Sequence, residues 1–144
     1  MTDRKPVVLF LCSQNSCRSQ MAEALLRHRG GDRFEAHSAG LTPAAIHPMA
    51  KRAMEEMGLS LEGHRPKGVE EYLGKLPVRF LITVCSGAAK ACPSVWPGVM
   101  NREDWGIEDP ATAEGSDQER MAVFRRVRDE LDAKIQAWLA QQKR

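Results

Sequence analysis

The feature that most constrains this chain is an uninterrupted apolar run, residues 7–11, that passes directly into a polar segment beginning at Cys12. Such a run is typical of a central parallel strand that is covered on both faces. Apolar residues at helical spacing follow the polar segment: Met21, Ala22, Leu25 and Leu26. The pattern therefore predicts a strand, a loop and a helix in immediate succession. At such a joint the loop N–H groups and the positive end of the helix dipole can converge on an anion.

The polar loop carries a nucleophile and a cation at a spacing that suits an oxyanion. Cys12 and Arg18 enclose five residues, which are Ser13, Gln14, Asn15, Ser16 and Cys17. We expect the backbone N–H groups of these five residues to surround the anion, with Cys12 beneath it. The same positive field, together with Arg18, favours the nucleophilic thiolate form of Cys12. The planar Arg18 guanidinium can bind two oxygens of a tetrahedral oxyanion at once.

A cysteine at the end of a strand is more often a small buried side chain than a nucleophile. Here the strand, the Cys-x5-Arg spacing, Ser19 and the following helix occur together, and this combination favours the catalytic interpretation. The segment from Cys12 to Ser19 resembles the phosphate-binding loop that low-molecular-weight protein tyrosine phosphatases share with arsenate reductases of the same fold. This resemblance implies that Cys12 is the nucleophile and Arg18 the oxyanion clamp.

The composition fits one soluble globular domain spanning residues 1–144, because 42% hydrophobic and 28% charged residues can build a sizeable core. Its 21 basic and 19 acidic residues are spread along the sequence, so no basic face suggests nucleic acid. The polar residues 1–6 do not resemble a secretory signal, and no apolar run approaches the roughly 18 residues of a membrane span. We expect a cytoplasmic monomer whose four cysteines are not a structural disulfide framework.

Strand and helix patterns alternate along the chain. Apolar runs predict strands at 7–11 and 78–85, and further strands are expected at 34–39 and 100–105. Helical spacing and helix-end signals predict one helix after the polar loop, one from Pro48 to Gly58, a short one at 69–73, and a long one from a capping box at Ser116 to Leu139. The last helix is expected to expose Arg125, Arg126 and Arg128 to solvent. Such alternation predicts a parallel sheet, and the resemblance implies an α/β single-domain three-layer sandwich with a four-stranded parallel sheet.

The strand predicted at 78–85 delivers a second cysteine, Cys85, to its carboxyl end, as the first strand does with Cys12. Ligands of parallel sheets bind beyond these ends, so both cysteines could face one crevice. Cys92 follows after six small or flexible residues. A zinc site is a weak interpretation, because typical zinc knuckles separate their cysteines by only two to four residues.

An aspartate before a proline, Asp109, follows the last predicted strand. Taken alone it is as often a turn residue as a catalytic one. In the family that the loop resembles, an aspartate before proline protonates the departing oxygen, which implies the role of general acid for Asp109. Glu108 lacks this position before the proline and is the weaker candidate.

Features outside the loop separate the two classes of enzyme. The phosphatases carry aromatic residues just after their Asp-Pro, whereas Ala111 and Thr112 follow here. Cys85 and Cys92 match the redox pair of thioredoxin-coupled arsenate reductases, and the dipeptide Trp105-Gly106 matches that subfamily as well. The resemblance therefore implies arsenate reduction by a relay through Cys12, Cys85 and Cys92, with electrons from thioredoxin and neither a bound cofactor nor a metal. A low-molecular-weight protein tyrosine phosphatase is the alternative, followed by a non-catalytic oxyanion sensor.

The resemblance also implies supporting roles near the loop. Ser19 is expected to donate a hydrogen bond to the Cys12 thiolate, and Asn15 to hold a left-handed turn. Gln14 replaces a glycine that is common at its position, and Cys17 has no chemical step and is interpreted as structural. Some of these reductases hold a potassium ion at positions that correspond to Asn15, Glu23, Ser38 and an aspartate, and the last position here is Lys67. Either the Lys67 ammonium takes the place of the cation or it points to solvent.

Overall fold

A computed structural model describes residues 5–12, 17–40, 45–61, 63–72, 77–84 and 101–142. Its centre is a four-stranded sheet in the order β2-β1-β3-β4, with every pair of neighbouring strands parallel. The strands are β1 (Val7–Cys12), β2 (Glu35–Gly40), β3 (Val78–Thr83) and β4 (Asn101–Asp104). The predicted α/β sandwich on a four-stranded parallel sheet is confirmed.

The first strand lies in the middle because its side chains are apolar on both faces. All six residues of β1 are buried, and they alternate between two hydrophobic clusters. Val8, Phe10 and Cys12 belong to the larger cluster, whereas Val7, Leu9 and Leu11 belong to the smaller one. This alternation follows from the two-residue repeat of a strand. The strand could not be buried so completely at the edge of the sheet.

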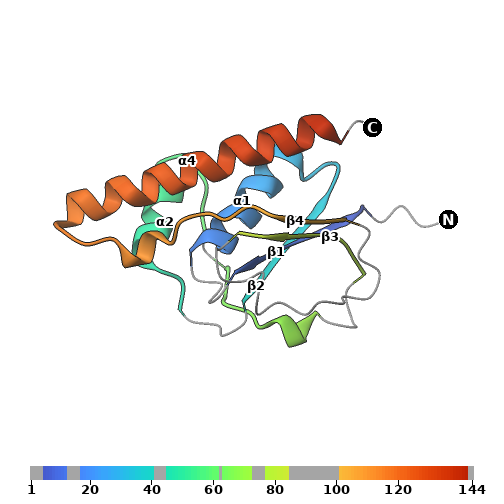
Figure 1. The fold of residues 1–144 in the computed structure, drawn as a ribbon, viewed down its shortest axis with the longest axis horizontal. Coiled ribbons are helices and arrows are strands. Elements are labelled where there is room, and N and C mark those ends of the chain that lie inside the picture. Colours follow the sequence, from blue (N-terminus) through green and yellow to red (C-terminus); the bar gives the residue numbers. More distant parts are fainter. Residues whose placement is uncertain are drawn as a thin grey trace.

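In the part of the chain that the structure describes, three α-helices cover the larger cluster. They are α1 (Arg18–Gly30), α2 (Pro48–Glu55) and α4 (Asp117–Gln141). Figure 1 shows α1 between the sheet and the long helix α4. The N-terminus of α4 is closed by the predicted capping box, in which Ser116 and Glu119 exchange side-chain and backbone hydrogen bonds. Because α4 buries one face against α1 and α2, it holds the helical layer together.

The opposite face of the sheet carries the smaller cluster. Val69 and Tyr72, from the short 3₁₀ helix η1 (Val69–Glu71) and the residue after it, pack against this cluster. A second 3₁₀ helix, η2 (Pro110–Thr112), lies between β4 and α4 in the sequence. The sheet is therefore covered on both faces, as the apolar run of β1 predicts.

The predicted elements are found, with ends that differ by a few residues. The strand predicted at 78–85 ends at Thr83. Cys85 lies outside the described residues. The expectation for Arg128 was wrong, because its side chain is only 11% exposed and bonds to α2. None of the helices in the described part of the chain combines the length and the apolar character that crossing a membrane requires.

Candidate active site

The carboxyl end of β1 meets the first turn of α1 at Cys12. The Cys12 Sγ and Ser19 Oγ atoms lie 2.9 Å apart, and both residues are buried. The contact predicted for Ser19 is therefore present. Because α1 begins at Arg18, the positive end of its dipole lies at the same place. This end of the sheet combines a buried thiol, a hydroxyl group and a helix N-terminus.

The Arg18 guanidinium is held on one side only. Its Nη1 donates to the Ile107 carbonyl oxygen at 3.0 Å, and its Nη2 lies 3.5 Å from Asp109 Oδ2. The Nε of Arg18 is buried and has no hydrogen-bond partner among the described residues. A buried donor without a partner costs free energy unless a ligand satisfies it. The arrangement leaves the Arg18 guanidinium available to bind an oxyanion.

Asp109 serves both as a turn residue and as part of the site. Its Oδ1 accepts from the Ala111 N–H at 3.0 Å, which caps η2, and its Oδ2 faces Arg18. The Asp109 side chain is 35% exposed, so it can exchange a proton with a bound substrate or water. Glu108 instead points away and pairs with Arg126 at 2.6 Å. Asp109 is thus the carboxylate that the fold brings to Arg18.

Behind the first turn of α1, the buried Glu23 carboxylate is surrounded by donors. Glu23 Oε1 accepts from Ser38 Oγ and from Lys67 Nζ, the latter at 3.3 Å, and Glu23 Oε2 lies 2.7 Å from Arg27 Nη2. The Lys67 residue is only 7% exposed. The alternative in which Lys67 points to solvent is therefore wrong. The Lys67 ammonium contacts the Glu23 carboxylate, the group beside which the other alternative placed it.

A neighbouring side-chain contact ties α1 to the segment that carries Lys67. Gln20 Nε2 donates to the Arg65 carbonyl oxygen at 2.8 Å, which turns Gln20 Oε1 towards His64 Nδ1 at 3.0 Å. His64 Nδ1 must then be the donor, because an amide oxygen only accepts. Burial lowers the pKa of His64 below its usual value, which favours the neutral ring. These bonds fix residues 64–67 beside the start of α1.

The second predicted cysteine follows directly after a residue that lies next to Cys12 in the sheet. Leu11 pairs with Thr83, and the Val84 N–H donates to the Leu11 carbonyl at 2.9 Å. On the other side of Val84, the Ile107 N–H donates to the Val84 carbonyl at 3.2 Å. Val84, the residue before Cys85 in the sequence, is therefore fixed between Leu11 and Ile107.

Several predicted residues cannot be placed. Ser13, Gln14, Asn15, Ser16, Cys85 and Cys92 lie outside the described residues. Cys17 is buried in the larger hydrophobic cluster just before α1, which fits its structural interpretation. Sequence reasoning missed the Ile107 carbonyl, which binds Arg18. Every residue type has a backbone carbonyl, so the sequence does not identify this acceptor. Only Gly106, the residue before Ile107, indicates an unusual turn.

Comparisons with known proteins agree with this geometry. The model of the family described as low molecular weight phosphotyrosine protein phosphatase matches residues 7–144. An arsenate reductase of Halalkalibacterium halodurans is 40% identical over 134 residues, which cover 93% of this chain and 95% of the relative.

Solved structures of arsenate reductases share the fold. One, in a phosphate-binding state, superposes with a TM-score of 0.81 at 30% identity, covering 96% of this chain and 99% of the other. A thioredoxin-dependent arsenate reductase of Corynebacterium glutamicum has a TM-score of 0.76 at 30% identity, covering 98% of this chain and 63% of the other.

Proposed function

Because this chain belongs to the low-molecular-weight phosphotyrosine protein phosphatase family, and within it to the arsenate reductases, we propose that it reduces arsenate to arsenite by a relay of thiols. The relay uses Cys12, then Cys85, then Cys92. The observation that carries the proposal is the buried pair of Cys12 Sγ and Ser19 Oγ, 2.9 Å apart at the N-terminus of α1, where the Arg18 Nε has no partner among the described residues.

In the first step the Cys12 thiolate attacks the arsenic atom of arsenate. Arg18 and the N–H groups of residues 13–17 hold the oxyanion, and Ser19 donates to the sulfur. Asp109 gives a proton to the departing hydroxide, which leaves as water. The product is a covalent Cys12 arsenate adduct in which arsenic is still As(V).

In the second step the Cys85 thiolate attacks the Cys12 sulfur. The electron pair of the sulfur–arsenic bond stays with arsenic, so arsenite, As(III), departs and a Cys12–Cys85 disulfide forms. Two thiols lose the two electrons that arsenic gains. The position of Val84, which precedes Cys85 in the sequence and is bonded to Leu11 at 2.9 Å, supports this step.

In the third step Cys92 attacks Cys85 and restores the Cys12 thiolate. A Cys85–Cys92 disulfide remains, and thioredoxin reduces it by thiol–disulfide exchange. The similarity to a thioredoxin-dependent arsenate reductase supports thioredoxin as the partner. The relay requires neither a resident cofactor nor a metal, because the protein thiols supply the electrons.

Phosphatase activity is the second candidate function. The family model supports it, and so does a site in which Cys12, Arg18 and Asp109 would serve phosphate esters equally well. The short side chains of Ala111 and Thr112 offer no aromatic platform for a phosphotyrosine ring. We therefore expect only residual hydrolysis of small aryl phosphates.

One experiment separates the two functions. Arsenate-dependent NADPH oxidation with thioredoxin and its reductase is measured beside hydrolysis of p-nitrophenyl phosphate. Phosphate in place of arsenate is the matched control, since it is a tetrahedral anion that the thiols cannot reduce. Fast hydrolysis without arsenate-dependent oxidation would favour the phosphatase.

Single-turnover mapping of disulfides then tests the relay. With one equivalent of arsenate, the wild-type protein should form a Cys85–Cys92 bond, and Cys92→Ser should stall as a Cys12–Cys85 bond. Cys85→Ser should release no arsenite by this route. Four reduced thiols in the wild type after arsenate would refute the relay.

A further inference from the structure

The chain changes direction at Gly106, between β4 and the turn that carries Asp109. Gly106 has φ +59°, in the left-handed region that side chains other than glycine and asparagine rarely adopt. The residues on both sides of it are fixed. A change in the backbone conformation of this turn must therefore be absorbed at Gly106 or must displace Ile107.

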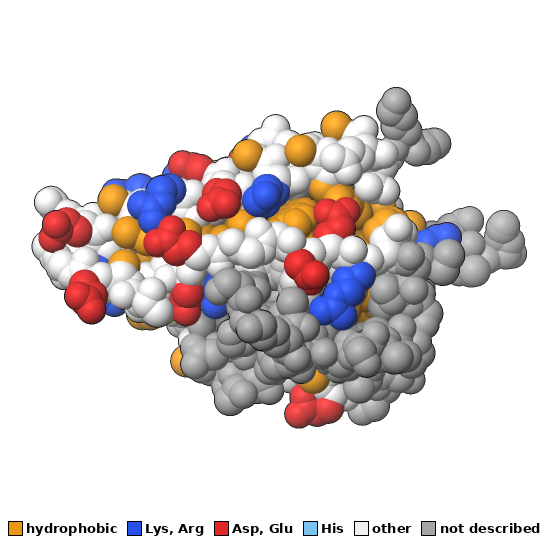
Figure 2. Space-filling view, viewed as in Figure 1, with side chains coloured by type: hydrophobic (Ala, Val, Ile, Leu, Met, Phe, Trp, Pro, Cys, Tyr) orange, Lys and Arg blue, Asp and Glu red, His pale blue; other side chains and the backbone are white. Residues whose placement is uncertain are grey.

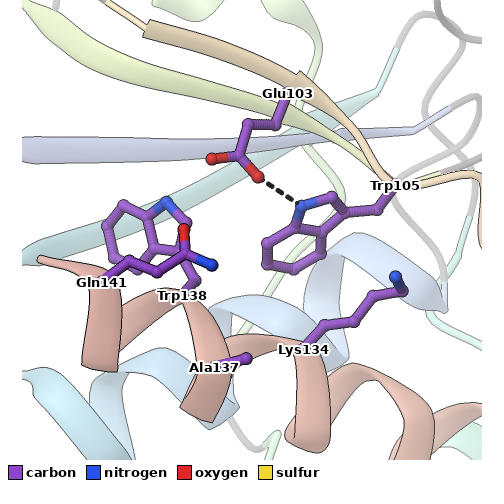
Figure 3. Close-up of a pocket in the computed structure, with 6 residues that line it drawn as sticks. All are labelled: Glu103, Trp105, Lys134, Ala137, Trp138 and Gln141. Carbon is purple, nitrogen blue, oxygen red and sulfur yellow. Dashed lines mark hydrogen bonds between the residues drawn. The ribbon is translucent and has the colours of Figure 1, made fainter.

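Trp105, before Gly106, is anchored by its side chain and its backbone. Its indole Nε1 donates to Glu103 Oε1 at 2.8 Å, as Figure 3 shows, and its ring centroid lies 6.0 Å from that of Phe10. Its backbone N–H donates to the Thr83 carbonyl at 2.8 Å. The indole lines a pocket of about 280 Å³ between β4 and α4. Figure 2 shows apolar side chains gathered between α4 and the sheet, with charged side chains around them.

Ile107, after Gly106, is fully buried and bonds on both of its peptide groups. Its N–H donates to the Val84 carbonyl at 3.2 Å, and its carbonyl accepts from Arg18 Nη1 at 3.0 Å. Ile107 therefore holds both Arg18, the oxyanion clamp, and Val84, the residue before Cys85 in the sequence. Both bonds depend on the direction in which the chain leaves Gly106.

We propose that Gly106 is a positioning residue whose left-handed conformation aligns Ile107 for both chemical steps. The N–H groups of Trp105 and Ile107 donate to consecutive carbonyls, those of Thr83 and Val84, whereas regular strand pairing would space the two acceptors two residues apart, and the left-handed Gly106 lies between the two donors. Through Ile107, Gly106 sets the place of Arg18 for the attack by Cys12. Through the bond between Ile107 and Val84 it sets the position of the residue that precedes Cys85 in the sequence. The second part rests on the proposed thiol relay.

The space around Gly106 makes a clean test possible. A Cβ added there would meet no atom within 4 Å, so a substitution acts through the backbone conformation and not through a clash. Asparagine tolerates the left-handed region, whereas a β-branched residue does not. Gly106→Asn and Gly106→Val are therefore matched variants of similar size that differ in the conformation they allow.

Gly58 supplies the control for strain alone. It has φ +80° at the end of α2, and an added Cβ there also meets nothing within 4 Å. No bond links Gly58 to the described residues of the active site. Gly58→Val should lower Tm as Gly106→Val does, and it should leave turnover unchanged.

The test measures kcat and KM for p-nitrophenyl phosphate, and the rate of Cys12–Cys85 bond formation with arsenate in the Cys92→Ser background. Gly106→Val should lower both rates roughly 10-fold to 100-fold, because small misplacements of reacting groups have effects of this size. Gly106→Asn should stay within about threefold of the parent protein. Gly106→Ala, with a milder backbone strain, replaces Gly106→Val if that variant does not fold.

Wild-type rates in a folded Gly106→Val, or an equal loss in Gly106→Asn, would overturn the proposal. A loss in the hydrolysis rate alone would overturn the link to Cys85. If the wild type hydrolyses p-nitrophenyl phosphate but forms no disulfide with arsenate, the proposed relay fails, and the placement of Arg18 by Gly106 is still judged by the hydrolysis rates.

Discussion

Two buried cationic side chains contact or begin α1 and differ in how fully they are paired. Arg18 begins the helix, and Lys67 bonds to Glu23 within it. Arg18 keeps an Nε without a partner among the described residues, and the carboxylate that faces it, Asp109, lies 3.5 Å away and is 35% exposed. Lys67 instead reaches Glu23, whose side chain is only 3% exposed and also receives Ser38 and Arg27.

The contrast separates a binding site from a supporting one. A buried donor without a partner is costly, and it persists where a ligand completes it. A buried carboxylate that receives several donors is already complete and has no such need. We therefore expect substitutions at Arg18 and Asp109 to act on catalysis, and substitutions at Glu23 and Lys67 to act on stability.

The largest effect on turnover is expected for Arg18→Lys. A lysine ammonium cannot reproduce the planar two-point clamp of the guanidinium, so turnover should fall roughly 1,000-fold, in the range seen when a key transition-state donor is lost. Steady-state kinetics with arsenate and with p-nitrophenyl phosphate measure this loss. Normal turnover and KM in a folded Arg18→Lys would contradict the role of Arg18.

A smaller loss is expected for Asp109→Asn. The amide keeps the shape of the side chain but cannot donate a carboxyl proton, so turnover should fall roughly 100-fold. The limb of the pH–rate profile that reports the acid should also disappear. Glu108→Gln is the control, because Glu108 points to Arg126 and not to Arg18. A profile unchanged in Asp109→Asn would identify another acid.

Glu23→Gln should act mainly on stability. It leaves Lys67 and Arg27 beside a neutral amide, and loss of one partner of a buried ion pair costs about 3–5 kcal/mol of unfolding free energy. Urea denaturation measures this. Glu71→Gln is the control, because the pair of Arg65 and Glu71 is exposed and its loss should change stability little. Glu23→Gln combined with Lys67→Met should recover part of the loss.

The smallest effect is expected from potassium. If the Lys67 ammonium takes the place of a cation beside Glu23, exchange of sodium for potassium at constant ionic strength should leave kcat and KM nearly unchanged. Lys67→Met, which removes the ammonium, is the variant in which a response to potassium becomes possible. Strong activation of the wild-type protein by potassium would exclude the substitution by lysine.

Local patterns in the sequence predicted the centre of the molecule. The apolar run at residues 7–11 predicted a strand covered on both faces, and the described fold confirms it. The capping box at Ser116 predicted the start of α4. Each of these signals depends on neighbours in the sequence, so it can be read without the fold.

The interpretation of Arg128 failed because its partners are distant in the sequence. Helical spacing assigned it to the solvated face of α4, yet its guanidinium donates to the Ala53 carbonyl at 2.7 Å and to Glu56 at 3.0 Å. Hydrogen bonds from Arg125 and Arg128 lower the pKa of Glu56 to about 2. Helical periodicity shows which direction a side chain takes, but not which neighbouring helix lies there.

The sequence by itself determined the residue types at the active site and the order of the strand, loop and helix that present them, because both are set by local spacing and by the chemistry of Cys12 and Arg18. Only the tertiary structure decided that Ile107 holds Arg18 through a carbonyl, and that Lys67 reaches Glu23 across 44 residues of chain. These contacts join a strand end or a loop to α1 from other parts of the fold. Their geometry depends on how parallel strands and helices pack, which no local pattern encodes.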